Sequence, residues 1–159
     1  MKYLYAPWRD SYFDVKDKTC IFCRAAKGKK DAERFVLYRG KLAFAMLNLF
    51  PYTNAHVLIA PYRHEGDLRK LSCEEIGEIM ELVKKTMCAF SKEFGCKGFN
   101  IGVNQGSVAG AGFASHIHFH VVGRWTGDTN FMTVVSDARV SPSSPVELYR
   151  KLKKYFNSV

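Results

Sequence analysis

The chain has 159 residues, with 24 lysines and arginines against 15 aspartates and glutamates, giving a net charge of +9. This length suits one domain with a substantial core, and a hydrophobic content of 47% excludes a disordered chain. No apolar run reaches the roughly 20 residues that span a bilayer, and residues 1–8 lack the apolar centre of a signal peptide. We therefore expect a cytoplasmic protein without a membrane partner.

The first half of the chain predicts an irregular arm followed by a hairpin. Residues 1–19 mix aromatic and charged side chains, and a Cys-x-x-C turn with a Lys/Gly-rich loop follows them. The apolar runs 35–38 and 42–47 are separated by Arg-Gly-Lys, which predicts two strands joined by a tight turn. A third strand is expected over residues 56–60, where Pro61 ends it.

The second half predicts two helices and two more strands. Ser72 begins the clearest helix with a capping box, and Gly95 is its natural stop. Strands are expected over residues 98–104 and 115–122, with a Gly/Ala-rich loop between them. A last helix opens at Ser144, again with a capping box and with proline at its first position.

The order of these elements predicts one α+β domain over residues 1–159. It comprises an N-terminal arm (1–19), a core (20–135) and a C-terminal tail with its helix (136–159). The sheet is expected to be five-stranded and largely antiparallel, with a long central helix and a C-terminal helix.

The five cysteines are an odd number in a chain expected to lack a signal peptide, so they do not predict a disulfide framework. Cys73, Cys88 and Cys96 stand in or beside a helical pattern and are expected to be buried apolar residues. Cys20 and Cys23 have the spacing with which two thiolates bind one metal ion. The spacing therefore predicts half of a tetrahedral zinc site.

Three of the five histidines, His116, His118 and His120, alternate along one expected strand. Side chains at this period share one face and lie about 7 Å apart. Crowded imidazoles titrate near neutrality and can serve as nucleophile, general acid or metal ligand. His56 begins the third strand, and His64 just beyond it is either a third zinc ligand or a loop residue without a role.

The run 116–122 resembles the H-φ-H-φ-H-φ-φ signature of the histidine-triad (HIT) superfamily. The resemblance extends over nearly the whole chain, because the Leu-Tyr-Ala-Pro-Trp-Arg arm (4–9) with Tyr12, the cysteine pair and Asn48, eight residues before His56, are all placed as in that superfamily. The segment 127–132 is similar to the branch that contains diadenosine tetraphosphate phosphorylases and ATP adenylyltransferases.

The resemblance implies a role for each matching residue. His118 corresponds to the nucleophile that attacks the α-phosphorus, His120 to the histidine beside the scissile oxygen, and His56 to a further catalytic histidine. The resemblance implies that Asn48 binds the ribose and that Asn104 lies near the α-phosphate. Ser107, Gly112 and Trp125 are further candidates for substrate binding.

The resemblance also implies a zinc site and an assembly. In zinc-containing members the ligands match Cys20, Cys23, His64 and His116. Four protein ligands leave no open position, so such a zinc is structural. No organic cofactor is expected, and the family implies a homodimer.

One loop departs from the family pattern. Many relatives carry Gly-Gln-Ser/Thr just before the triad, whereas the matching positions here are Gly112 and Phe113, in a loop one residue longer. The Ser107 hydroxyl, or backbone N–H groups of residues 110–112, could replace the missing phosphate contact. The acceptor of the second step, phosphate or water, stays open.

The sequence therefore predicts an enzyme that cleaves nucleoside polyphosphates at the α-phosphate, with dinucleoside polyphosphates as substrates. A nucleotide-binding or sensory module with little turnover is the alternative. A zinc-stabilised RNA-binding protein is the third hypothesis. The basic clusters, however, lack the interleaved aromatic residues that bind single-stranded nucleic acid. Nucleic acid is therefore not an expected partner.

Overall fold

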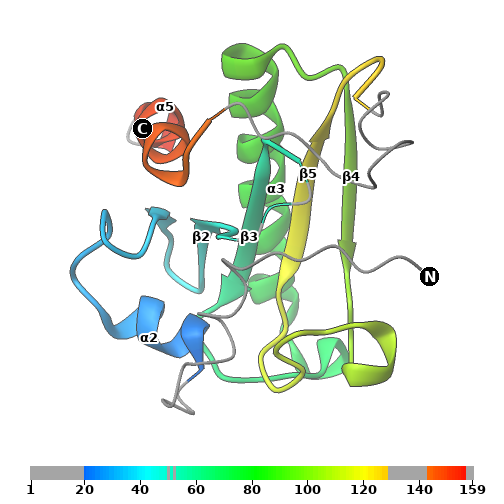
Figure 1. Ribbon diagram of the computed structural model, residues 1–159. Coiled ribbons are helices and arrows are strands. Elements are labelled where there is room, and N and C mark those ends of the chain that lie inside the picture. The colour runs from blue at the N-terminus through cyan, green and yellow to red at the C-terminus, as the bar shows by residue number, and fades with distance from the viewer. Residues whose placement is uncertain (1–19, 50, 52, 129–142, 157–159) are drawn as a thin grey trace, which may run out of the picture.

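The computed structural model describes residues 20–49, 51, 53–128 and 143–156, so the expected N-terminal arm lies outside it. Five antiparallel strands form one sheet in the order β1-β2-β3-β5-β4 (Figure 1). The strands are β1 (Val36–Arg39), β2 (Ala43–Leu47), β3 (His56–Pro61), β4 (Gly98–Val103) and β5 (Phe119–Arg124). The helices are α2 (Ile21–Lys27), α3 (Cys73–Phe94) and α5 (Pro145–Phe156), with the 3₁₀ turns η2 (Leu68–Lys70) and η3 (Ser107–Ala109). The predicted α+β fold, with its long central helix, is confirmed.

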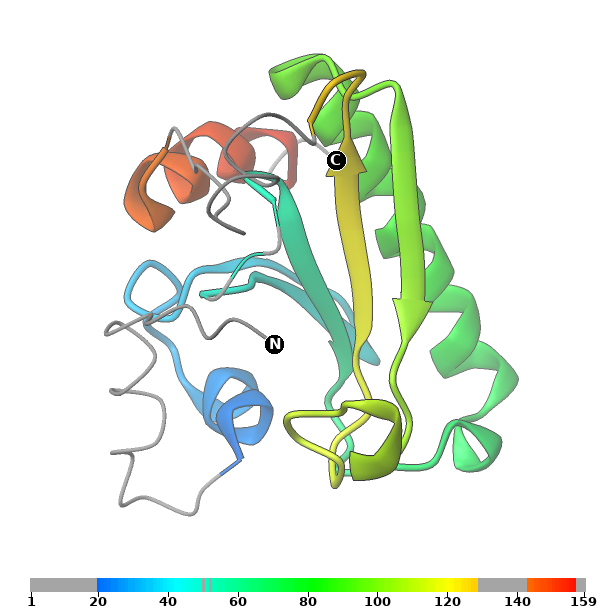
Figure 2. The same cartoon turned by 45° about the vertical axis from the view of Figure 1, so that its right-hand side comes forward.

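One face of the sheet packs on α3 (Figure 2). Ser72 accepts a hydrogen bond from the Glu75 N–H while the Glu75 carboxylate accepts one from Ser72 N–H, so the predicted capping box is present. Gly95 ends the helix with φ 64°, a left-handed conformation that favours glycine. Apolar side chains of α5, including Leu152 and Phe156, join this core beside α3.

The opposite face of the sheet carries the histidines. Leu58 on β3 pairs with His120 on β5, and side chains of paired residues point to the same side. His56, two residues from Leu58, therefore shares that face. A second apolar cluster covers the part of this face formed by β1, β2 and β3, and its helical component is α2.

Two details of the secondary structure differ from the sequence-based expectations. Residues 21–27 form a helix rather than a turn and loop, because Phe22 and Ala25 find a buried surface on the sheet. β5 begins at Phe119, not at residue 115. The preceding stretch turns instead toward a group of four possible metal ligands, Cys20, Cys23, His64 and His116, which we call the metal-type cluster.

The cysteine prediction is correct at only one of three positions. Cys96 is buried, whereas Cys73 and Cys88 are exposed because they lie on the solvent side of α3. The buried residues of this helix include Ile79, Val83 and Phe90. None of the described helices is both long and apolar enough to cross a membrane.

Candidate active site and metal centre

The four residues expected to hold zinc come together at one end of the sheet. The ligand atoms of Cys20, Cys23, His64 and His116 all lie within 4.8 Å of one another. Cys20 Sγ is 3.4 Å and Cys23 Sγ 3.6 Å from His116 Nδ1, and the two Nδ1 atoms of His64 and His116 are 3.3 Å apart. Ligand atoms around a tetrahedral zinc ion, with bonds of about 2.0–2.3 Å, lie about 3.3–3.8 Å apart. The cluster therefore fits a tetrahedral ion.

A main-chain carbonyl orients the most buried ligand of this cluster. His116 is fully buried, and its Nε2 lies 3.0 Å from the Pro61 carbonyl oxygen. Because a carbonyl oxygen only accepts, Nε2 carries the proton, and the lone pair is on Nδ1, which faces the thiols. Metal-binding histidines are commonly oriented by such a second hydrogen bond.

Arg39 holds the helix that carries the two cysteines. Its guanidinium donates to three carbonyl oxygens at the end of α2, those of Ala25 (2.7 Å), Ala26 (2.9 Å) and Gly28 (2.6 Å). It also pairs with Asp31 at 2.9 Å. These are carbonyls that a helix end leaves without intrahelical partners, so Arg39 acts as a C-terminal cap from a neighbouring strand. Arg39 thus holds the C-terminal end of α2 against the sheet.

His118 immediately precedes β5 and is buried. Its Nδ1 lies 2.9 Å from the main-chain oxygen of His116, so Nδ1 carries the proton and the lone pair is on Nε2. Burial lowers the pKa of His118, although the hydrogen bond to His116 opposes this shift. The ring is therefore a neutral imidazole with a fixed tautomer, which is the nucleophilic form.

His120 and His56 form a second, directly bonded pair. His56 Nε2 lies 2.9 Å from His120 Nδ1, and the His118 and His120 rings are 5.1 Å apart, closer than the spacing expected along a flat strand. Burial, with the neighbouring imidazoles, lowers the pKa of His56 to about 3 and that of His120 to about 4. The Asn48 amide nitrogen lies 3.2 Å from His56 Nδ1. These pKa shifts favour the neutral form of His56, His118 and His120 at pH 7.

The loop after β3, residues 63–70, braces the stretch that carries the triad. Its Glu65 carbonyl accepts the Ile117 N–H at 2.7 Å, between the first two triad histidines. A Cβ on Gly66 would lie 2.4 Å from the Ala114 carbonyl oxygen, so only glycine permits this approach. We call residues 63–70 the brace loop.

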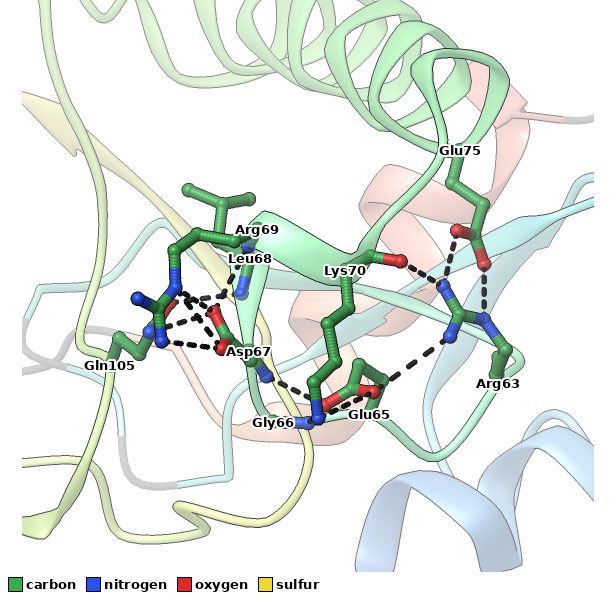
Figure 3. Close-up of polar contacts among 9 residues, drawn as sticks. All are labelled: Arg63, Glu65, Gly66, Asp67, Leu68, Arg69, Lys70, Glu75 and Gln105. Atoms are coloured by element: carbon green, nitrogen blue, oxygen red, sulfur yellow. Dashed lines mark hydrogen bonds and ion pairs between the residues drawn. The ribbon is translucent and has the colours of Figure 1, made fainter.

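The brace loop is also bonded to Gln105, which immediately precedes the Gly/Ala-rich loop of residues 106–112 (Figure 3). We call residues 106–112 the glycine loop. The Gln105 side chain accepts from the Leu68 N–H at 2.9 Å and donates to the Asp67 carboxylate at 3.0 Å. The Glu65 carboxylate accepts from the N–H groups of Gly66 and Asp67 (2.8 and 3.0 Å). A ligand segment of the metal-type cluster and the glycine loop are therefore one connected unit.

The expected substrate-binding residues divide into two groups. The β4–β5 pairing ends at Val103↔Phe119, which places Asn104 and His118 at the same end of the sheet. Ser107 and Gly112 lie exposed on the loop that follows. Trp125 lies beyond the other end of β5, where its indole N–H donates to the Phe94 carbonyl at 2.7 Å, and the structure does not bring it to the triad.

Three residues of the site were not singled out from the sequence. Phe22 lies against two triad histidines, with ring centroids 4.6 Å from His118 and 5.1 Å from His116. Arg39 caps α2, and Gln105 joins the two loops. The position of Phe22 inside the Cys-x-x-C motif was the available signal, whereas the contacts of Arg39 and Gln105 depend on long-range packing.

A HIT domain model matches residues 29–127. An AP-4-A phosphorylase of Mycobacterium tuberculosis is 41% identical over 112 residues, which is 70% of this chain and 57% of that protein. An adenosine 5'-monophosphoramidase of Schizosaccharomyces pombe is 34% identical over 104 residues, 65% of this chain and 73% of that protein. A zinc-bound histidine triad family protein from Mycobacterium smegmatis gives a TM-score of 0.70 at 27% identity, covering 87% of this chain and 93% of that chain.

The matched model covers more than half of the 159 residues, and the solved neighbour has the same fold. The chain belongs to the HIT family. It spans 57% of the length of the mycobacterial phosphorylase that it matches.

Proposed function

We propose that this protein cleaves dinucleoside polyphosphates at the α-phosphate through a nucleotidyl-His118 intermediate, and that inorganic phosphate accepts the nucleotidyl group. The observation that carries the proposal is the tautomer of the His118 ring. Its proton is fixed on Nδ1 by a main-chain oxygen at 2.9 Å, which leaves Nε2 unprotonated for attack. Relatives named as an AP-4-A phosphorylase and an adenosine 5'-monophosphoramidase support nucleotidyl chemistry at this site.

The reaction has two displacement steps. In the first, His118 Nε2 forms a bond to the α-phosphorus of diadenosine tetraphosphate, and the bond from that phosphorus to the bridging oxygen breaks, releasing ATP. In the second, a phosphate oxygen attacks the same phosphorus and the N–P bond breaks, releasing ADP and restoring the neutral imidazole. A covalent intermediate divides one difficult displacement into two easier ones.

The bonded pair His56 and His120 is proposed to serve the leaving group. With its pKa lowered to about 4, His120 is neutral at pH 7, so it contributes a hydrogen bond rather than a full proton transfer. If His56 Nε2–H donates to His120 Nδ1, the His120 proton is on Nε2 and can point to the bridging oxygen. ATP is already a good leaving group, so a hydrogen bond to the departing oxygen suffices.

The glycine loop is proposed to hold the phosphates. Gly106 and Gly110 both have positive φ, 84° and 85°, which turns the backbone tightly and permits a close approach to a ligand. Asn104 just before this loop and Ser107 on it would add side-chain donors. Gln105 fixes the root of the loop to the brace loop, as described above. Asn48 is proposed to bind the ribose, and Gly112 to contribute its backbone N–H group.

The cluster of two cysteines and two histidines is proposed to bind one structural zinc ion. The distances and the His116 tautomer support a tetrahedral ion with no position left for substrate. When bound, such an ion supplies a rigid cross-link between α2, the brace loop and the triad. It takes no part in the displacement steps.

We also propose a homodimer formed through the edge of β4. Among the described residues β4 is an edge strand, and its Ile101 side chain is 46% exposed. At the other edge, Lys153 from α5 donates to the carbonyls of Val36 and Leu37 on β1. An exposed strand with an apolar side chain is suited to pair with a second copy.

Product analysis tests the proposed reaction. Incubation with diadenosine tetraphosphate and phosphate is expected to give ADP and ATP in equal amounts, and omission of phosphate to stop turnover. AMP and ATP would instead show a hydrolase with water as acceptor. Hydrolysis of an adenosine phosphoramidate in preference to the dinucleotide would favour a phosphoramidase, the second candidate, because it shares the first step. Tight binding without turnover would support a sensory module.

A further inference from the structure

The aromatic ring inside the Cys-x-x-C motif lies directly on the central triad histidine. Phe22 is 0% exposed, and its ring is 4.6 Å from the His118 ring at an interplanar angle of 29°. Phe113 contacts Phe22 edge-on at 6.0 Å. Offset-stacked and edge-on rings at these distances attract one another beyond their burial alone. One face of His118 is therefore in close contact with a ring that is itself held in place.

The helix that carries Phe22 contacts other elements at both of its ends. At its start Cys20 and Cys23 lie in the four-residue metal-type cluster, and at its end Arg39 bonds three carbonyl oxygens. A phenylalanine between two ligands cannot move away from the sheet without displacing them. The position of the Phe22 ring is therefore set by the cluster and by Arg39 together.

We propose that Phe22 is a positioning residue for His118, and that α2 keeps its ring stacked on the imidazole. The hydrogen bond from Nδ1 to the His116 oxygen holds one edge of the His118 ring, and a tilt of the ring plane is the freedom that remains. Stacking on Phe22 restricts that tilt, so that Nε2 keeps one direction. The metal-type cluster thus acts on the reaction through Phe22. The proposal rests on the proposed function only in that His118 is the nucleophile.

A misplacement of a reacting atom by about 1 Å can cost about 100-fold in rate. Phe22→Leu keeps an apolar side chain but removes the ring, and Phe22→Tyr keeps the ring. Phe156→Leu is the matched control, because Phe156 is a phenylalanine with 1% exposure in the other apolar cluster, beside α3. All variants are compared after zinc content and melting temperature have been measured.

The experiment combines steady-state kinetics on diadenosine tetraphosphate with side-chain ¹H–¹⁵N spectra of the histidines at one neutral pH. Phe22→Leu is expected to lower kcat by about 10- to 100-fold with KM and zinc content unchanged. The His118 signals should broaden or show both tautomers. Phe22→Tyr should restore most of kcat, and Phe156→Leu should retain the parent values.

Two results would overturn the proposal. An unchanged kcat with unchanged His118 signals in Phe22→Leu would show that the ring does not position the imidazole. A rise in KM alone would show that Phe22 contacts substrate instead. If the parent protein has no turnover, the proposed function fails, but the comparison of spectra still decides whether Phe22 orders His118.

Discussion

His56 Nε2 and His120 Nδ1 lie 2.9 Å apart, which joins two neighbouring strands by a bond between two imidazoles. Burial and nearby imidazoles lower the pKa of His56 to about 3, against an ordinary value of 6.5. Burial disfavours a positive charge on either ring, so the folded chain takes up a proton here less readily than the unfolded chain does. This difference makes the stability of the fold depend on pH.

The stability is expected to fall on mild acidification. The unfolded chain protonates His56 below about pH 6.5, whereas the folded chain resists protonation until about pH 3. The contribution of neutral His56 to the free energy of unfolding is thus complete above pH 6.5, and it is lost as the pH falls toward 3. Between pH 6.5 and 5 one such group costs about 2 kcal/mol in the free energy of unfolding. Denaturant titrations across this range measure the loss.

His56→Gln removes this titration and retains polar contacts. The variant should show a smaller pH dependence of the free energy of unfolding between pH 6.5 and 5 than the parent. Identical slopes for parent and variant would show that His56 does not remain neutral in the folded chain.

Metal analysis tests the cysteine and histidine cluster. The protein is expected to contain about one zinc ion per chain. Cys20→Ser or His64→Ala should reduce this content and lower the melting temperature by roughly 10 °C, the shift produced by a few kcal/mol in a domain of this size. Cys88→Ser is the control, since Cys88 is exposed and outside the cluster. A metal-free preparation that melts at the parent temperature would contradict a structural site.

Arg39 and Arg69 form a matched pair for testing the cap on α2. Each pairs with an aspartate, but Arg39 also bonds three carbonyls and is 26% exposed in its side chain, against 84% for Arg69. Hydrogen bonds to charged groups contribute about 1.5–3 kcal/mol. Arg39→Met should therefore lower the melting temperature by about 5 °C or more, while Arg69→Met leaves it unchanged. Equal effects would exclude a special role of Arg39 in holding α2.

The proposed dimer is tested at β4. Ile101→Lys places a charge on the exposed edge strand and is expected to convert dimers to monomers in sedimentation velocity. Val146→Lys on α5 is the control, because the two side chains are almost equally exposed, 46% and 47%. A parent protein that sediments as a monomer at micromolar concentration would refute the β4 interface.

Much of this architecture could be predicted because its signals are local. The capping box at Ser72, the stop at Gly95 and the hairpin centred on Gly40 each depend on a few neighbouring residues, and each is present. The grouping of Cys20 with His116 was implied by family resemblance, not by spacing, because 96 residues separate the two.

The remainder depends on contacts across the sheet. The helix α2 has only seven residues, too short for a clear periodic pattern, and is held by Arg39 from another element. The expected strand through His116 and His118 begins later because Ile117 bonds to the brace loop instead of a neighbouring strand. Neither relationship has a signal within a short stretch of sequence.

The central claim is that His118 forms the covalent intermediate. The protein is mixed rapidly with radiolabelled diadenosine tetraphosphate in the absence of phosphate, quenched, and digested for mass spectrometry. We predict an adenylyl group on the peptide that contains His118, discharged to ADP when phosphate is added before quenching. His118→Ala should lower kcat by about 1,000-fold or more and abolish the label. A label on another residue, or cleavage by His118→Ala at the parent rate, would contradict the assignment.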